Sequence, residues 1–476
     1  MTQTEYDAIV VGSGPNGLAA AITLQQAGLK VLLVEGKKTI GGGLRSAELT
    51  LPGFIHDICS AIHPLAIAAP FFKTVSLEKF GFEFIHPAIP LAHPFEDGTA
   101  ALIKRSLEET AALLGTDEKT YQQLIHLLVA KWDTFIGDTL NPLSFPKHPF
   151  DFARFGLNAI QPAMWLSKHF STKHGKGLWG GLAAHSIQPF HKLTTSAIGL
   201  VLMAAAHTNG WPIPKGGSQQ LANALAAYFV SIGGKIETQF YVESLGQLPS
   251  AKAVLFDVTP RQLLKIAGHT FSSIYKWQLE KYRYGMSVFK VDWALDGPVP
   301  FASEGSAMAG TLHLGNTFQE IAWSEGQTWK GKHPEKPFVL LAQPSVLDAT
   351  RAPAGKHTLW GYCHVPNGST KDMTEAIERQ VERFAPGFRE RILAKHVMNS
   401  VQMEEHNPNY VGGDINGGVI DLGQLFTRPA LRWSPYRTST KGLYICSSST
   451  PPGGGIHGMC GYNAARRVLK DLFPKN

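Results

Sequence analysis

The feature that most constrains the fold is the stretch "DAIVVGSGPNGLAAAITLQQAGLKVLLVE" at positions 7–35. A short apolar run at 8–11 leads into a glycine-rich turn, a helical pattern over 15–27 and a second apolar run at 30–35. Gly28 is suited to end the helix, because glycine adopts the left-handed conformation found there. This strand, turn, helix and strand predict a parallel α/β fold.

The glycines of the turn have separate uses in a nucleotide-binding domain. Gly12 permits a tight turn, Gly14 lets backbone N–H groups approach a pyrophosphate, and Gly17 lets the helix pack closely on the strand. Glu35 ends the second strand, 18 positions after Gly17, where a carboxylate can accept hydrogen bonds from a ribose. The stretch therefore predicts dinucleotide binding, with a purely structural turn as the alternative.

A second glycine cluster follows the acidic residue. Gly41, Gly42 and Gly43 precede Arg45 in "IGGGLRS", and a plain NAD domain needs no such cluster. A long dinucleotide that carries a ring system at its far end would need backbone clearance at a second point. The cluster favours FAD, and a flexible loop is the alternative.

Composition narrows the class of protein. The 476 residues are 44% hydrophobic and 17% charged, which excludes a disordered chain and permits two or three packed domains. A net charge of +7 is too diffuse to indicate nucleic-acid binding. The four widely spaced cysteines are expected to be reduced thiols. With no secretion signal or spanning segment in the pattern, we expect a cytoplasmic protein and leave open a peripheral association with a membrane.

Three stretches in order, "VVGSGPNGLAAA", "IGGGLRS" and "GLYICSSSTPPGGGIHGMCGYNAA", resemble motifs of the phytoene desaturase-like FAD-dependent oxidoreductases, which have the amine-oxidase-like FAD fold. The stretches "NPNYVGGDINGG" and "QLFTRP" resemble the branch that contains pyridine nucleotide-disulfide oxidoreductase domain-containing protein 2. The resemblance spans nearly the whole chain. It implies FAD as cofactor and an apolar substrate.

The C-terminal stretch also predicts a strand, a turn and a helix from its residue pattern alone. "GLYICS" suits a buried strand, the Pro/Gly run from Pro451 to Gly458 suits a turn at its end, and "GMCGYNAARRVLKDLF" has helical spacing. We expect this bare backbone to let a flavin ring and its ribityl chain pass closely, with a tight structural turn as the alternative. Ser447 and Ser448 stand where many relatives have Gly-Asp, so hydroxyl or N–H groups would serve the cofactor there.

The motifs and the resemblance together define a predicted set of FAD contacts. Within it, the resemblance implies that the Val242 backbone meets the adenine, whereas an ordinary β-core residue is the alternative. The predicted cofactor-binding residues are Gly12, Gly14, Pro15, Asn16, Gly17, Glu35, Gly36, Gly42, Gly43, Leu44, Arg45, Val242, Ser448, Gly454, Gly455, Ile456 and Gly458.

The predicted architecture is an α/β protein with α+β insertions, in which a Rossmann-like FAD-binding domain is interrupted twice by a substrate domain. The FAD-binding parts are 1–66, 206–285 and 421–476. The substrate domain has a mainly helical part at 67–205 and an antiparallel sheet at 286–420, which contains "SVFKVDWALDG", "FVLLAQPSV" and "HTLWGYCHVP".

Residues 150–179 interleave aromatic and basic side chains, namely Phe152, Phe155, Trp165, Phe170 and Trp179 with Arg154, Lys168, Lys173 and Lys176. Such a mixture suits a membrane interface where an apolar substrate could be collected. A core helix with a solvated face is the slightly favoured alternative. The sequence therefore leaves peripheral membrane contact open.

His457 is the candidate catalytic residue, because it lies inside the turn expected to face the flavin and could position a substrate or move a proton. A satisfied structural histidine is the alternative. Cys460 could be redox-active, although a packed small residue is favoured. None of the histidines has the helical spacing of a metal site, so no metal is expected.

The favoured function is hydride exchange between flavin N5 and an isoprenoid- or lipid-like substrate, as a desaturase or saturase. An amine or amino-acid oxidase is one alternative, and a non-catalytic FAD-containing interaction protein is another. Substrate identity, electron acceptor and oligomeric state stay open.

Overall fold

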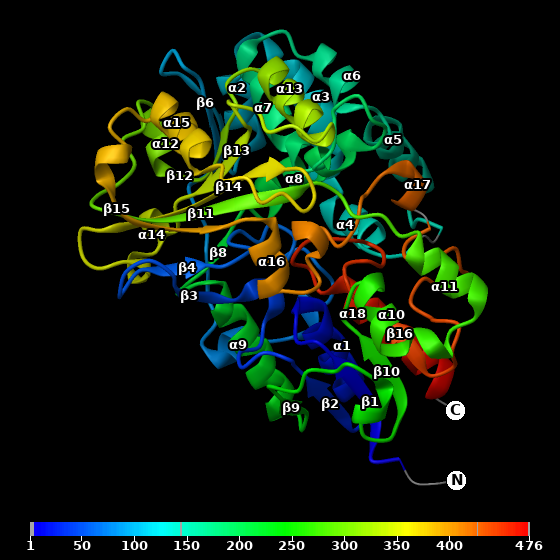
Figure 1. The fold of residues 1–476 in the computed structure, drawn as a ribbon. Coiled ribbons are helices and arrows are strands. Elements are labelled where there is room, and N and C mark those ends of the chain that lie inside the picture. The colour runs from blue at the N-terminus through cyan, green and yellow to red at the C-terminus, as the bar shows by residue number, and fades with distance from the viewer. Residues whose placement is uncertain (1–3, 143–144, 426, 475–476) are drawn as a thin grey trace.

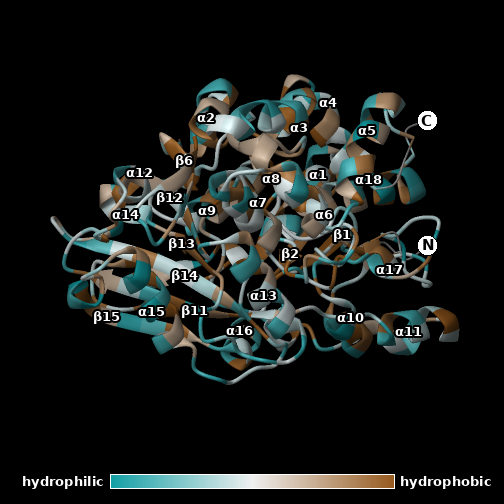
Figure 2. Ribbon diagram, turned by 90° about the horizontal axis from the view of Figure 1, so that it is seen from above, coloured by the Kyte–Doolittle hydropathy of each residue, from teal (hydrophilic) through white to brown (hydrophobic). Residues whose placement is uncertain are grey.

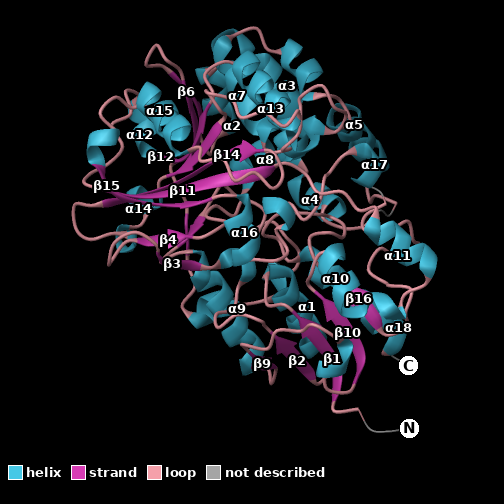
Figure 3. Ribbon diagram, in the orientation of Figure 1, coloured by secondary structure: helices cyan, strands magenta, loops and turns pink. Residues whose placement is uncertain are grey.

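The structure is a computed structural model that describes residues 4–142, 145–425 and 427–474. Two sheets organise it, a smaller parallel one and a larger, mostly antiparallel one (Figure 3). The predicted α/β class, with a Rossmann-like sheet and a separate antiparallel sheet, is confirmed.

The parallel sheet has five strands in the order β16-β10-β1-β2-β9. Their bounds are β1 (Tyr6–Val11), β2 (Val31–Val34), β9 (Lys235–Glu237), β10 (Ala251–Phe256) and β16 (Leu443–Ile445). All four neighbouring pairs are parallel. The strands come from three distant parts of the chain, coloured blue, green and red at the bottom of Figure 1.

Side-chain alternation along β1 explains how the parallel sheet is covered on both faces. Ala8 and Val10 join the core around α1 (Pro15–Gln26), while Ile9 and Val11 join the core beneath α10 (Pro260–Ala267). On the first face, α1 packs beside α9 (Ser218–Ser231) and α18 (Met459–Leu472). A Cβ atom on Gly461 would lie 1.7 Å from the Asn16 carbonyl oxygen, so only glycine allows this approach of α18 to α1.

The larger sheet has seven strands in the order β15-β11-β14-β13-β12-β6-β7. Their bounds are β6 (Ile89–Pro94), β7 (Ala100–Ile103), β11 (Ser287–Leu295), β12 (Ala309–Leu314), β13 (Val339–Ala342), β14 (His357–Val365) and β15 (Ile392–Met398). All pairs are antiparallel except β12 with β6.

The expectation that the sheet lies within 286–420 and that 67–205 is mainly helical needs a correction. Strands β6 and β7 belong to the earlier segment and form a hairpin around the turn at Asp97-Gly98, where Gly98 has φ +80°. This dipeptide is a hairpin signal, and β12 then supplies an apolar edge for β6. The predicted five-part domain division otherwise stays a prediction.

From residue 107 onward this segment is mainly helical, as expected. Its α-helices are α2 (Leu107–Leu113), α3 (Glu118–Ala130), α4 (Trp132–Thr139), α5 (Pro149–Ala159), α6 (Ala163–Leu166), α7 (Lys173–Ala184) and α8 (Thr195–Thr208). In the basic-aromatic stretch, Phe155, Phe170 and Trp179 are buried and Phe152 is half-buried, whereas Trp165 is exposed. Most of these rings are therefore core residues.

The remaining elements connect or cover the two sheets. They are β3 (Ser46–Glu48), β4 (Ile55–Asp57), β5 (Phe84–Ile85), β8 (Ile213–Pro214), α11 (Ser273–Glu280), α12 (Glu304–Met308), α13 (Phe318–Trp329), α14 (Pro344–Leu347), α15 (Thr374–Phe384), α16 (Ser400–His406) and α17 (Leu422–Leu425). No helix within the described ranges is both long and apolar enough to cross a membrane.

Candidate functional site

A cavity of about 350 Å³ lies at the carboxyl ends of the parallel strands, where ligands of open α/β sheets bind. The turn after β1, the second glycine cluster and the C-terminal Pro/Gly turn all contribute to its wall. Every predicted cofactor-binding residue lines it except Gly17, Leu44 and Gly458. Three stretches that are far apart in the sequence thus meet around one space.

The three exceptions have packing roles. A Cβ atom on Gly17 would lie 1.9 Å from the Gly12 carbonyl oxygen, so Gly17 lets helix α1 sit on the turn. Leu44 is fully buried in the core. Gly458 has φ +68°, and its Cβ would lie 2.8 Å from the Phe71 ring.

Bare backbone forms the wall where the two N-terminal glycine stretches meet. Gly12 has φ +99°, which only glycine adopts readily. A Cβ on Gly42 would lie 2.9 Å from the Gly14 Cα, so these two main chains approach closely. Beside them, the buried Asn16 Oδ1 has no hydrogen-bond partner among the described residues. A cradle of backbone with an unused polar atom fits a dinucleotide.

Glu35 lies in the cavity wall with both carboxylate oxygens already occupied. Its Oε2 accepts from the Ser13 N–H at 3.0 Å and the Ser13 hydroxyl at 2.6 Å. Its Oε1 accepts from the Lys37 N–H at 2.9 Å and the Arg45 guanidinium at 3.1 Å. A carboxylate offers about four acceptor positions, so a ribose hydroxyl would have to share or displace one of these donors. Arg45, a predicted cofactor-binding residue, pairs with Glu35.

Asp257 is a cavity residue that is absent from the predicted set of FAD contacts. Its Oδ2 accepts from the Gly17 N–H at 2.9 Å, near the start of α1. Burial raises the pKa of the Asp257 carboxyl to about 7, and the nearby Glu35 charge adds to this rise. Because β10 is parallel to β1 and adjacent to it, strand order would have placed Asp257 beside the Gly12 turn.

Another wall comes from residues 406–410 and Ile415, within or next to the stretch "NPNYVGGDINGG". From sequence, this stretch indicated a resemblance and no site residue. The Tyr410 hydroxyl would lie 2.5 Å from a Cβ on Gly43, so this ring fixes the space beside the second glycine cluster. Burial lowers the pKa of His406 to about 4, assisted by the charges of Arg45 and Lys37.

The far end of the cavity is formed by Phe240, Tyr241, Val242 and Glu243 together with Lys265 and Ile266 of α10. Val242 lies in the loop after β9, not in a strand, and it is also buried in the core beneath α10. The Tyr241 ring explains Gly36, because a Cβ there would lie 2.7 Å from its Cδ2 atom.

His457 is placed beneath the C-terminal turn and is absent from the cavity wall. Its Nδ1 accepts from the Met459 N–H at 3.0 Å, at the start of α18, and Nε2 has no partner among the described residues. Burial lowers the pKa of His457 to about 4. Cys460 is likewise buried, and its thiol lies 3.4 Å from the Gly453 carbonyl oxygen. Both side chains are therefore buried outside the cavity wall.

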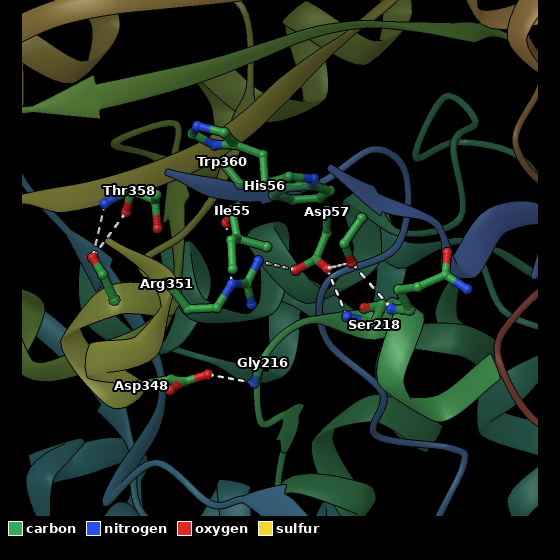
Figure 4. Close-up of polar contacts among 12 residues, drawn as sticks. Ile55, His56, Asp57, Gly216, Ser218, Asp348, Arg351, Thr358 and Trp360 are labelled. Atoms are coloured by element: carbon green, nitrogen blue, oxygen red, sulfur yellow. Dashed lines mark hydrogen bonds and ion pairs between the residues drawn. The ribbon is translucent and has the colours of Figure 1, made fainter. Parts of the chain in front are cut away.

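A buried ion pair lies at the junction between the two sheets (Figure 4). Arg351 donates to the Asp57 carboxylate at 2.8 Å, and both side chains are almost fully inaccessible. Asp57 also accepts from the Ser46 hydroxyl at 2.6 Å and from the Ser218 N–H at 2.7 Å, at the start of α9. Burial alone would raise the pKa of Asp57, but the Arg351 charge and these hydrogen bonds hold it below its usual value.

The same junction holds a second buried pair, Lys290 with Asp292, both on β11. His56, next to Asp57 in β4, has Nδ1 at 3.8 Å from Asp292 Oδ1. Burial lowers the pKa of His56 to about 4. Polar side chains of β4 and β11 thus lie close together in the interior. None of them was singled out from the sequence for this role.

The comparisons with known proteins agree with this geometry. Residues 10–72 match the family model described as an NAD(P)-binding Rossmann-like domain. The chain is 26% identical to the mouse pyridine nucleotide-disulfide oxidoreductase domain-containing protein 2, over 98% of this chain and 94% of that protein. It is 24% identical to a phytoene desaturase (lycopene-forming) of Pseudescherichia vulneris, over 95% and 96%. A limonene dehydrogenase chain of Castellaniella defragrans is 22% identical, over 98% and 95%.

Among solved structures, a redesigned putrescine oxidase has a similar fold. Its TM-score is 0.63 with 15% sequence identity, covering 98% of each chain. At this identity the likeness establishes the fold alone. The predicted resemblance to phytoene desaturases and to the amine-oxidase-like fold is confirmed.

Proposed function

We propose that this chain uses FAD to exchange hydride with an apolar, isoprenoid- or lipid-like substrate, because its first part matches a dinucleotide-binding domain and oxidoreductases such as phytoene desaturase match nearly its whole length. The reaction would be a carbon–carbon desaturation or saturation. The observation that carries the proposal is the cavity itself, whose wall combines both N-terminal glycine stretches with the C-terminal turn.

The substrate class rests on the names of full-length relatives. Phytoene and limonene, in the names of two of them, are unsaturated isoprenoid hydrocarbons. Both relatives match this chain over at least 95% of its length, so they share the parts that frame the cavity as well as the larger sheet. An isoprenoid hydrocarbon is therefore the first substrate class to test.

The residues of the cavity would divide the work of holding FAD. The Gly14 and Gly42 backbones and the start of α1 would face the pyrophosphate, where the helix dipole favours negative charge. Glu35 would orient a ribose hydroxyl, and the Val242 loop would border the adenine. Ser448 and the Gly454-Gly455 backbone would approach the ribityl chain and ring. When bound, FAD supplies the hydride chemistry.

The remaining walls would exclude water from the ring and leave its substrate side apolar. Ile415, Ile456 and the Tyr410 ring line the cavity near the C-terminal turn and Gly43. His457 lies outside the wall and is assigned no proton transfer. The chain's contribution would be alignment of a C–H bond and exclusion of water.

The test has two stages. Mass spectrometry of the denatured protein would first identify the bound nucleotide and any co-purifying apolar molecule, with FAD expected. The FAD-loaded protein would then be mixed without oxygen with isoprenoid alkenes and, separately, with primary amines. Bleaching of the flavin absorbance by an isoprenoid, or reoxidation of the reduced flavin by one, supports the proposal.

Two results would contradict it. Failure to retain FAD after incubation with excess cofactor would remove the cofactor assignment. Rapid bleaching and peroxide formation with amines, and none with isoprenoids, would replace the substrate class with that of an amine oxidase. A Gly14→Ala variant provides the matched control, since it changes the cavity wall without touching the larger sheet.

A further inference from the structure

One edge of the molecule carries an unusual concentration of exposed apolar side chains. We call this set the apolar band, and its members are Phe145, Phe150, Leu157, Ile160, Met164, Trp165, Leu193, Ile274, Trp277, Leu422, Leu431 and Trp433. Trp433 is 100% exposed, Phe150 89% and Leu157 70%, so these are not marginal cases. Exposed apolar side chains gathered along one edge are typical of an interaction site.

The segments that carry the band are joined by hydrogen bonds and an ion pair. The Thr194 N–H donates to the Ile160 carbonyl at 2.9 Å, and Gln188 donates to the Ile420 carbonyl at 2.9 Å. Further along, Arg283 pairs with Asp421 at 2.7 Å. The Leu431 N–H donates to the Gln278 side chain of α11 at 2.6 Å. Helices α5, α17 and α11 accordingly follow one edge in both Figure 1 and Figure 2.

On helix α5, the exposed apolar side chains are distinct from those that pack into the core. Its inner side buries Phe155 and Ala159. Phe150 and Leu157 lie seven residues apart on the exposed side, and Ile160 continues their spacing at the helix end. A surface helix of a soluble protein normally has a polar outer face. Helix α5 instead presents apolar side chains to both the core and the solvent.

The charges along the band favour a lipid surface over a protein partner. Exposed cations flank the apolar residues, namely Lys147, Arg154, Lys168, Lys276 and Lys281, and none forms an ion pair with another described residue. The acidic Asp151 and Asp421 are paired with Lys131 and Arg283. Protein interfaces are depleted in lysine, whereas lysines around exposed aromatic and aliphatic side chains are typical of interfacial membrane contact.

We propose that the apolar band docks on the surface of an anionic lipid bilayer, with its apolar side chains in the headgroup region and its cations against lipid phosphates. Attachment is peripheral. This inference is independent of the proposed reaction, because it rests on the exposed face and not on the cavity.

The experiment is flotation of the full chain with vesicles of phosphatidylcholine alone or mixed with phosphatidylglycerol, at low and high salt. We expect binding to the anionic vesicles, weakened by salt. A Leu157→Ser/Trp433→Ser variant should partition about tenfold more weakly, since two apolar anchors are lost. The matched control is Val230→Ser/Trp323→Ser, which removes two side chains that are 54% and 55% exposed on α9 and α13. That control should bind like the wild type.

A second variant separates charge from apolar contact. Arg154→Glu/Lys276→Glu should reduce binding to anionic vesicles and remove its salt dependence. The proposal is overturned if the wild type does not float with anionic vesicles, or if the control loses as much binding as the band variant. It is also overturned if light scattering shows a dimer that Leu157→Ser/Trp433→Ser dissociates while vesicles are not bound, since the occupant is then a second copy.

Discussion

The cavity beside the parallel sheet and the junction between the two sheets are both buried and polar, yet they are built differently. In the cavity, much of the wall is glycine backbone, and Asn16 Oδ1 has no partner among the described residues. At the junction, side-chain charges are matched in pairs, Arg351 with Asp57 and Lys290 with Asp292. The first region has backbone and an unpartnered amide oxygen to offer a ligand, whereas in the second each charged group has an oppositely charged partner within the protein.

Substitutions in the two regions should therefore affect different properties of the protein. When a buried ion pair loses one partner, the other charge is left uncompensated, so the substitution lowers the stability of the fold. When a glycine of the cavity wall is replaced by a residue with a side chain, space for a ligand is lost, so the substitution weakens ligand binding. Changes at the two sites should therefore separate unfolding from cofactor affinity.

The largest effect is expected at the junction. Arg351→Met should lower the free energy of unfolding by about 3–5 kcal/mol, because Asp57 is left buried and unpaired. Urea unfolding measures this. Lys73→Met is the comparison, since its pair with Asp133 is 57% and 84% exposed and should contribute less than about 1 kcal/mol. Equal losses in the two variants would mean that Arg351 and Asp57 are solvated.

The next effect concerns Asp257 and depends on pH. Its pKa rises from 3.8 to about 7 on folding, so the folded state holds the proton more tightly and stability falls as pH increases between about 4 and 7. Asp257→Asn keeps an acceptor for the Gly17 N–H and cannot ionise. At pH 8 it should be more stable than the wild type by about 2–4 kcal/mol, and at pH 4 equal to it. Thermal unfolding across this range tests the sign, and a parallel pH profile in the two proteins would refute it.

The cavity wall should respond through affinity. A Cβ on Gly14 would lie 2.7 Å from Asp257 Oδ2, so Gly14→Ala crowds the wall at the start of α1. We expect FAD to bind about ten- to a hundredfold more weakly, which corresponds to the ~1–3 kcal/mol cost of overpacking. Flavin fluorescence titration measures the affinity. Gly137→Ala in α4, where a Cβ would meet nothing within 4 Å, should leave it unchanged.

The smallest effect is expected at His457. Because its Nδ1 accepts from the Met459 N–H at the start of α18, His457→Ala should lose about 1 kcal/mol of stability, as other helix caps do. His457→Asn can supply an acceptor and should recover much of it. The pH profile of flavin reduction should be the same in both variants. A lost pH limb in both would restore a proton-transfer role.

Local pattern was sufficient for the parallel βαβ unit and for the glycine-rich parts of the cavity wall. The Gly12 and Gly14 turn, the Gly42 cluster and the C-terminal turn each carry a backbone requirement that only certain residues meet, so they could be recognised singly. Asp257, just after β10, could also have been predicted from the sequence, through the order of the parallel strands. Residues 406–410 could not, because no short-range pattern shows which loop covers a cavity.

The dinucleotide fold and the positions that need bare backbone could thus be predicted from the sequence, since glycine spacing and strand–helix periodicity are local properties. Side-chain pairing and burial became known only from the tertiary structure. It paired Glu35 with Arg45, kept His457 out of the cavity wall, and brought Arg351 to Asp57 from almost 300 positions away. It also buried Phe155 while exposing Leu157 on the same helix. These outcomes depend on which surfaces meet, and burial, pairing and pKa follow from that meeting.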